Sequence, residues 1–183
     1  MEFVKIVLVT GPARSGKSEW AEAMAQHAQK RVTYIATSTL NPEDQDWQRR
    51  IQQHRQRRPP DWQLQEVPLA LAEVIGAGTA QDCFLVDSLG TWLANLLDQD
   101  EETWQATVLA FLASLQNTAS QVILVAEETG WGVVPAYPMG RQFRDRLGAL
   151  TRQVGTVADA VYLVVAGHAL NLRQLAIPLD SPR

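Results

Sequence analysis

The 183-residue sequence is poor in three side chains that often carry chemistry, with one cysteine, three histidines and three lysines. A single thiol cannot form a disulfide within the chain, and it also excludes metal clusters that need several thiolates. Because Cys83 lies inside an apolar run, we expect it to be a small buried side chain.

Other absences narrow the class of protein. No apolar run reaches the length that a membrane span needs. The N-terminus leads directly into a strand-like segment, without the basic region, apolar stretch and cleavage site of a secretory signal. The formal net charge of −4 gives no overall basic surface for nucleic acid. We therefore expect a cytoplasmic protein with no membrane span and no nucleic-acid partner, folded as a single domain over residues 1–183.

What the sequence does contain is a complete phosphate-loop motif near its N-terminus. It matches the pattern G-x-x-x-x-G-K-[ST], and its residues are Gly11, Pro12, Ala13, Arg14, Ser15, Gly16, Lys17 and Ser18. The apolar residues 4–10 precede it as a strand, and residues 19–30 follow with helix-forming composition. The pattern predicts backbone N–H groups around phosphate oxygens, Lys17 at the β- and γ-phosphates, and Ser18 on Mg²⁺.

Further strands and helices alternate along the chain. We predict strands at residues 32–36, 83–87, 121–126 and 160–166, and a short extended segment at 62–67. Helices are expected at residues 41–57, 69–77, 89–97, 104–115 and 139–157, with an acidic turn at 98–102 and a frayed tail from about Asn171. This alternation predicts an α/β fold with an open, mostly parallel sheet flanked by helices.

Candidate ligand residues follow several of these strands, at the sheet edge where such folds bind ligands. They are Thr37-Ser38, Asp87 and Glu127-Glu128. An apolar run that ends in aspartate is a weak signal alone. With the phosphate loop upstream, it predicts that Asp87 is a Walker B acid that holds Mg²⁺. The loop 129–135 contains two glycines, a tryptophan and a proline, and loops of this kind at sheet ends often bind ligand.

An arginine-rich segment contains the one histidine in an unusual setting. Five arginines fall between positions 49 and 58, and His54 lies among them. Such a run is usually a solvated helix face, and a histidine near Trp47 and Ile51 is usually a packed residue. Because arginine makes bidentate contacts with phosphate, His54 is also a candidate nucleophile for phosphorus.

The remaining motifs decide among the phosphate-loop classes. The stretch 126–129 lacks the N-K-x-D motif with which switch GTPases read guanine, and the chain is short for a motor domain. A small-molecule kinase or a nucleotidyltransferase is left as the best class.

Several motifs in order resemble one known family, the bifunctional adenosylcobinamide kinase / adenosylcobinamide-phosphate guanylyltransferases of cobalamin biosynthesis. The similarity extends over roughly residues 6–166. The motifs that carry it are residues 10–18, 34–38, 50–54 with 58–59, Trp62 with Glu66, 86–89, 92–97, 128–135 and 143–145.

The resemblance implies a two-step activity with Mg²⁺ as cofactor. A nucleoside triphosphate, ATP or GTP, phosphorylates adenosylcobinamide, and GMP then passes from GTP through a guanylylated histidine to adenosylcobinamide phosphate. It also implies a sheet like that of recombinase-type ATPases and a homotrimer. By position, His54 is the guanylylated residue, and the nucleotide contacts are the phosphate loop, Ala36, Thr37, Ser38, Arg55, Gln56, Arg57, Arg58, Glu66 and Asp87.

The sequence departs from the family pattern at Glu127, where asparagine is usual, and in the stretch 148–152, which includes Thr151 and Arg152. These departures bear on the acceptor site and on whether both activities persist. Two alternatives stay open at this stage: a kinase with only one activity, in which His54 is merely packed, and a non-catalytic nucleotide-binding regulator.

Overall fold

The structure is a computed structural model that describes residues 4–39 and 58–179. The predicted helix at residues 41–57 lies outside the described residues, and so do His54, Arg55, Gln56 and Arg57.

The described residues form one seven-stranded sheet in the order β3-β2-β4-β5-β1-β6-β7. Every neighbouring pair is parallel except β6 and β7, which confirms the predicted α/β fold with a mostly parallel sheet. The strands are β1 (Ile6–Gly11), β2 (Arg31–Ala36), β3 (Gln63–Glu66), β4 (Asp82–Asp87), β5 (Gln121–Glu127), β6 (Ala160–Val165) and β7 (His168–Asn171).

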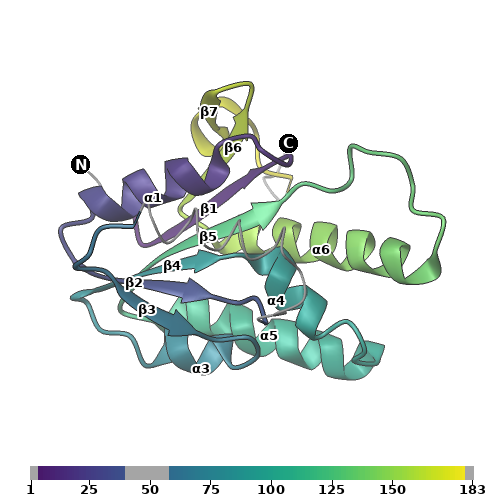
Figure 1. Cartoon of the computed structure of the whole chain (residues 1–183), viewed down its shortest axis with the longest axis horizontal. Helices are drawn as coiled ribbons and strands as arrows, with labels where there is room; N and C mark the ends of the chain where they lie inside the picture. The colour runs from purple at the N-terminus through teal and green to yellow at the C-terminus, as the bar shows by residue number, and fades with distance from the viewer. Residues whose placement is uncertain (1–3, 40–57, 180–183) are drawn as a thin grey trace.

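Helices cover both faces of the sheet (Figure 1). The helix that follows the phosphate loop, α1 (Lys17–His27), packs on one face. The other face is covered by α3 (Leu71–Gly76), α4 (Leu89–Asn95), α5 (Glu101–Asn117) and α6 (Pro138–Val157). None of the described helices is long and apolar enough to cross a membrane.

Alternation within the strands produces these two cores. In β1, Val7 and Val9 face Ala21 on α1, whereas Ile6 and Leu8 face the helices on the other side. Successive side chains of a strand point to opposite faces, so a strand covered on both sides must be apolar throughout. Cys83 lies in β4 and is fully buried, as expected.

Several ends of helices and strands shift by one to three residues from the sequence-based expectation, and two differences have a clear structural cause. Glu101 and Glu102 belong to α5 instead of an acidic turn, because the Asp100 side chain caps the helix by accepting the Thr103 N–H at 2.8 Å. The chain also does not fray at Asn171, where β7 ends and the short helix α7 (Leu172–Leu175) begins. Arg173 secures this segment, since its guanidinium donates to the carbonyls of residues 155, 156 and 158.

Candidate nucleotide-binding site

The phosphate loop joins β1 to the N-terminus of α1, as its sequence predicts. Gly16 precedes α1 with φ of +91°, a left-handed conformation that side chains with a Cβ rarely adopt. At Gly11, a Cβ would lie 2.3 Å from the carbonyl oxygen of Val164 on β6. Both glycines are therefore required by the backbone path, and that path aims the first N–H groups of α1 toward an anion.

Two side chains of this loop are suited to phosphate oxygens. Lys17 is 9% exposed, and its ammonium donates to the Pro12 carbonyl at 3.3 Å, so it lies back along the loop. The Ser15 hydroxyl is buried without a hydrogen-bond partner in the described part of the structure. A buried polar atom without a partner is costly, and a phosphate oxygen would satisfy it.

The register of the sheet brings the predicted strand-end residues to one edge. Ala36 of β2 pairs with Glu66 of β3 on one side and with Asp87 of β4 on the other. Strand β5 separates β4 from the phosphate-loop strand, and its last residue, Glu127, pairs with Gly11. Ala36, Glu66, Asp87 and the phosphate loop, which lie far apart in the sequence, therefore share the carboxyl edge of the sheet.

Asp87 is held by Tyr34, a residue of the 34–38 motif to which the sequence analysis gave no role of its own. The Tyr34 hydroxyl donates to Oδ2 of Asp87 at 2.7 Å, and the guanidinium of Arg58 lies 4.0 Å from the centre of the Tyr34 ring. Burial and the neighbouring Asp87 charge raise the pKa of Tyr34 far above its usual range. The phenol is therefore a permanent donor to Asp87.

Glu127, the last residue of β5, binds the start of α4. Its carboxylate accepts from the Ser88 hydroxyl through Oε1 and from the Gly90 N–H through Oε2 at 3.0 Å. Desolvation raises the pKa of Glu127 above its usual value, assisted by Asp87 and opposed by the Ser88 hydrogen bond. Glu127 thus connects the central strand of the site to the helix that follows Asp87.

The turn from β4 into α4 has a dense set of hydrogen bonds. Ser88 and Thr91 form a capping box, in which each side chain accepts from the other residue's N–H. The Thr37 hydroxyl donates to the Ser88 carbonyl at 2.7 Å and accepts from the Ser88 N–H at 3.0 Å. The Asn95 amide donates to the Thr37 carbonyl at 2.6 Å. Thr37 is fully buried, so its side chain supports the turn that carries Asp87.

The other predicted contacts divide between the edge of the site and the undescribed segment. Glu66, the last residue of β3, is exposed. Ala36 at the end of β2 and Ser38 just beyond it are partly exposed, and so is Arg58. Arg58 reaches the site through Tyr34. The structure does not describe His54, so its role stays a prediction.

The other two histidines have ordinary contacts, as expected. His27 Nδ1 donates to the Ala23 carbonyl at 2.6 Å, one turn back in α1, and His168 Nδ1 donates to the Ala166 carbonyl at 2.8 Å.

The donors at this edge fit a magnesium ion. Ser18 and Asp87 offer a hydroxyl and a carboxylate, and hard oxygen ligands of this kind are those that Mg²⁺ takes. No group of three or more histidine, cysteine, aspartate or glutamate side chains clusters as a metal site within residues 4–39 and 58–179. Mg²⁺ bound with substrate phosphates needs no such cage.

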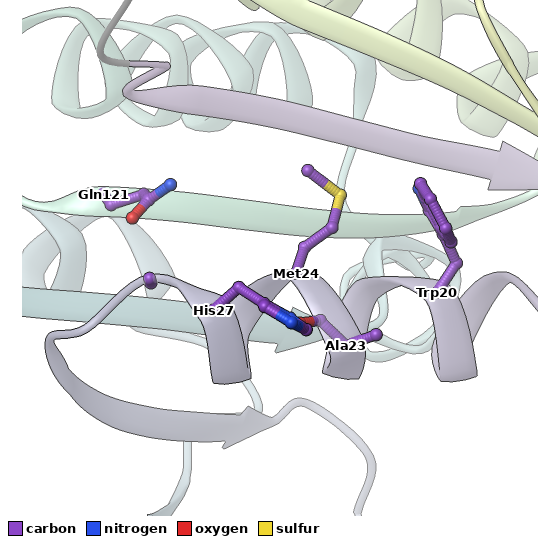
Figure 2. A pocket seen from close by; sticks show the side chains of 6 residues that line it. Trp20, Ala23, Met24, His27 and Gln121 are labelled. Atoms are coloured by element: carbon purple, nitrogen blue, oxygen red, sulfur yellow. The ribbon is translucent and has the colours of Figure 1, made fainter. Parts of the chain in front are cut away.

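An open hollow of about 300 Å³ lies away from this edge. It is lined by Trp20, Met24 and His27 of α1 and by Gln121 at the amino end of the neighbouring strand β5 (Figure 2). Because it leads toward the amino ends of the strands, it is not the phosphate site.

Sequence reasoning gave no structural role to four supporting residues, Tyr34, Ser88, Thr91 and Asn95, although all except Thr91 lie in motifs of the family resemblance. Ser88 has a recognisable signal, since serine directly before an apolar helical run is a typical N-cap. Tyr34 and Asn95 bond to partners 53 and 58 positions away, and Thr91 bonds to Ser88 within the first turn of α4. A single sequence does not reveal such pairs.

Comparison with known proteins gives consistent matches over most of the chain. The model of the family "Cobinamide kinase / cobinamide phosphate guanyltransferase" matches residues 7–172. The bifunctional adenosylcobalamin biosynthesis protein CobP of Pseudomonas aeruginosa is 39% identical over 168 residues, which cover 91% of this chain and 96% of that protein. The protein CobU of Escherichia coli K12, with the same description, is 35% identical over 183 residues, covering 92% of this chain and 99% of its own length.

Solved structures with similar folds are ATPases and related proteins of low sequence identity. An ATPase of a bacterial type III secretion system matches 97% of this chain and 60% of its own, with a TM-score of 0.52 and 8% identity. A protein from Pyrococcus horikoshii OT3 has the same TM-score and identity, and covers 97% of this chain and 95% of its own. The RadB recombinase aligns over 87% of this chain with a TM-score of 0.45. The first two of these proteins share the overall fold of this chain.

Proposed function

This chain belongs to the cobinamide kinase / cobinamide phosphate guanyltransferase family, and we propose that it performs both reactions at the one edge described above. In the first, the γ-phosphoryl group of ATP or GTP passes to the aminopropanol hydroxyl of adenosylcobinamide. In the second, GMP passes from GTP to adenosylcobinamide phosphate, giving adenosyl-GDP-cobinamide. The observation that carries the proposal is a phosphate loop at the same edge of the sheet as Asp87, across the single strand β5, in a chain that matches this family from residue 7 to residue 172.

Phosphoryl transfer needs positioning and charge stabilisation more than covalent help from the protein. The α1 N-terminus and the loop N–H groups hold the phosphates, and Lys17 stabilises negative charge as the bond to the γ-phosphorus breaks. Ser18 and Asp87 would hold Mg²⁺, which neutralises charge on the phosphate oxygens when bound. The acceptor hydroxyl oxygen forms the new bond, and the nucleoside diphosphate leaves.

Guanylyl transfer uses His54 as a covalent carrier in this proposal. A neutral imidazole nitrogen attacks the α-phosphorus of GTP, the bond to the β-phosphate oxygen breaks, and pyrophosphate leaves. A phosphate oxygen of adenosylcobinamide phosphate then attacks the same phosphorus, and the phosphorus–nitrogen bond breaks to restore the histidine. Arg55, Gln56, Arg57, Arg58 and Glu66 are proposed nucleotide contacts from the family match.

The acceptor is proposed to contact the loop between β5 and α6. Glu128 opens this loop, and its N–H donates to the Gly11 carbonyl at 2.9 Å, so the loop starts against the phosphate-loop strand. Trp131, Val133 and Tyr137 are 62%, 94% and 79% exposed. Figure 1 shows the loop arching away from the sheet. Exposed apolar side chains on a loop that starts at the phosphate-loop strand are suited to the apolar face of a large macrocycle.

A homotrimer is also proposed, on the family resemblance alone. Sedimentation velocity of the purified chain tests it, and a monomer at micromolar concentration would contradict it.

Labelled GTP tests the proposed function. Incubation with Mg²⁺ and GTP labelled at the α-phosphate should leave acid-labile, base-stable GMP on the protein, whereas label at the γ-phosphate should leave none. Addition of adenosylcobinamide should discharge the label and yield phosphorylated and guanylylated corrinoids. His54→Ala should lose the α-label and retain at least part of the phosphorylation, whereas His27→Ala, the matched control, should label normally.

The same experiment separates the alternatives. A kinase with one activity would phosphorylate the corrinoid and never acquire the α-label. A non-catalytic regulator would bind the nucleotide and modify neither the protein nor the corrinoid. An α-label that persists in folded His54→Ala would show that the nucleophile is another residue.

A further inference from the structure

Tyr34 is a buried side chain with one charged partner at its hydroxyl and another over the face of its ring. It is 4% exposed and belongs to the core that packs against α1. Its hydroxyl donates to Asp87 Oδ2 at 2.7 Å, and its ring face lies 4.0 Å from the Arg58 guanidinium carbon. Asp87 lies 53 positions and Arg58 lies 24 positions after Tyr34, so this one side chain joins two separate parts of the site.

We propose that Tyr34 is a positioning residue that orients both the metal-binding carboxylate of Asp87 and the nucleotide-binding guanidinium of Arg58. The inference rests on the proposed function for the roles of those two partners. The sequence pattern does not assign this role, since a tyrosine in a buried strand is typical of a core residue.

The hydroxyl has a geometric effect on Asp87. A carboxylate at a strand end can rotate about its last torsion, which is broad for aspartate. One hydrogen bond to Oδ2 selects a narrow range of that rotation, and a ligand to a metal ion with strict octahedral geometry depends on such orientation. The phenol hydroxyl donates to Oδ2 at 2.7 Å, so the hydrogen bond fixes the position of this carboxylate oxygen relative to the Tyr34 ring.

The ring has a separate effect on Arg58. A guanidinium over an aromatic face is attracted by the ring quadrupole, more strongly where water is excluded. The planar contact also restricts the rotation of a long side chain, so less entropy is lost when it binds phosphate. Because one atom of Tyr34 serves Asp87 and the ring serves Arg58, substitutions can remove the two effects one at a time.

The test is calorimetric titration of a non-hydrolysable GTP analogue, with and without Mg²⁺, into four variants. Tyr34→Phe keeps the ring and loses the hydroxyl. Its affinity for the metal-free analogue should equal that of the wild type. The increase in affinity that Mg²⁺ gives should be about tenfold smaller than in the wild type, a difference that corresponds to the loss of one hydrogen bond to a charged group. Arg58→Ala should show the opposite pattern, weaker binding with an unchanged effect of Mg²⁺. Tyr34→Leu should show both losses.

Thr33→Val is the matched control, since Thr33 is a buried neighbour on the same strand with its side chain on the other face. It should bind as the wild type does in both conditions. Coupling gives a further check, because Arg58→Ala should cost much less in Tyr34→Leu than in the wild type.

The inference is wrong if Tyr34→Phe retains the full effect of Mg²⁺, or if it weakens binding equally with and without Mg²⁺. It is also wrong if Thr33→Val reproduces the Tyr34→Phe pattern. If Tyr34→Leu does not fold, Tyr34→Phe and Arg58→Ala decide alone. Because these titrations need no turnover, a wild type that binds the analogue and never modifies a corrinoid would contradict the proposed function and leave the Tyr34 result intact.

Discussion

The carboxylate of Glu127 lies directly against Gly90. Oε2 accepts the Gly90 N–H at 3.0 Å, and a Cβ placed on Gly90 would lie 2.1 Å from that same oxygen. The glycine is needed here for close approach, and the contact joins the end of β5 to the start of α4.

Gly90→Ala should therefore disturb the site as well as the fold. Glu127 or the first turn of α4 must move, and overpacking of this kind costs about 1–3 kcal/mol of unfolding free energy. Denaturant unfolding measures the loss, and the rate of phosphoryl transfer should fall with it. Gly148→Ala is the control, because that helical glycine has open space around its Cβ position. It should be neutral or slightly stabilising. A Gly90→Ala variant as stable as wild type would contradict the contact.

Lys17→Ala should abolish both reactions, because one phosphate loop serves both in the proposed function. Loss of a charge-assisted donor to the phosphates should reduce each rate by about 10²-fold or more. Steady-state assays of the two steps, run separately, measure this. Lys30→Ala removes a partly exposed lysine that follows α1, lies away from the phosphate loop and donates to the Ala80 carbonyl at 2.9 Å, and it should leave both rates unchanged. Near-normal turnover of either step by Lys17→Ala would refute the shared site.

Asp87→Asn should weaken Mg²⁺-dependent turnover more than nucleotide binding. The asparagine oxygen can still accept from Tyr34, so the local packing survives while the charge that favours Mg²⁺ is lost. Initial rates over a range of Mg²⁺ concentrations, with calorimetric binding of GTP, separate the two effects. The matched charge control is Asp98→Asn, which removes an exposed carboxylate. Unchanged kinetics of Asp87→Asn at saturating Mg²⁺ would make Asp87 a structural residue.

Trp131→Ala should raise the KM for the corrinoid acceptor and leave formation of the protein–GMP intermediate unchanged. Loss of apolar contact from one aromatic side chain corresponds to about tenfold in affinity. Labelling with GTP alone reports the first half-reaction, and discharge by increasing acceptor concentrations reports the second. Leu109→Ala on α5, with a 65% exposed side chain, is the control. An unchanged KM for the acceptor would assign the loop to another role. So would an unchanged KM together with a different sedimentation coefficient of the Trp131→Ala protein.

Asp82→Asn should make stability less dependent on pH. The Asp82 carboxylate accepts from the Thr79 hydroxyl at 2.6 Å and from Arg31 Nε at 2.8 Å, and these contacts hold its pKa below the usual 3.8. A lowered folded-state pKa gives stability that is present above pH 3.8 and lost as pH falls through the folded value.

Asp82→Asn should accordingly cost about 1–3 kcal/mol at neutral pH, with the difference from wild type shrinking under acid. Denaturant unfolding between pH 2 and pH 7 measures it. Exposed Asp61→Asn should show little difference at either pH. A constant difference across this range would mean that the contribution of Asp82 does not depend on its charge.

The sequence alone determined most of the helices and strands of the described residues, and it predicted the type of site. The apolar strands, the phosphate loop and the carboxylate after β4 are local signals, because period, glycine placement and strand-end polarity are properties of adjacent residues. They were sufficient to predict a parallel sheet, to place Asp87 at its carboxyl edge, and to identify the family from motifs such as residues 10–18 and 128–135.

Only the tertiary structure decided what surrounds those residues. The order of strands sets β5 between the phosphate loop and β4, which brings Glu127 against Gly90. The lateral register places the Tyr34 hydroxyl on Asp87 and its ring under Arg58. These contacts join residues 24–53 positions apart, and a pattern along the chain carries no information on which distant strand lies beside another until the sheet is assembled. The antiparallel pairing of β7 with β6 is likewise decided only by the tertiary structure, and it attaches Asn171, where the polar tail begins, to the edge of the sheet.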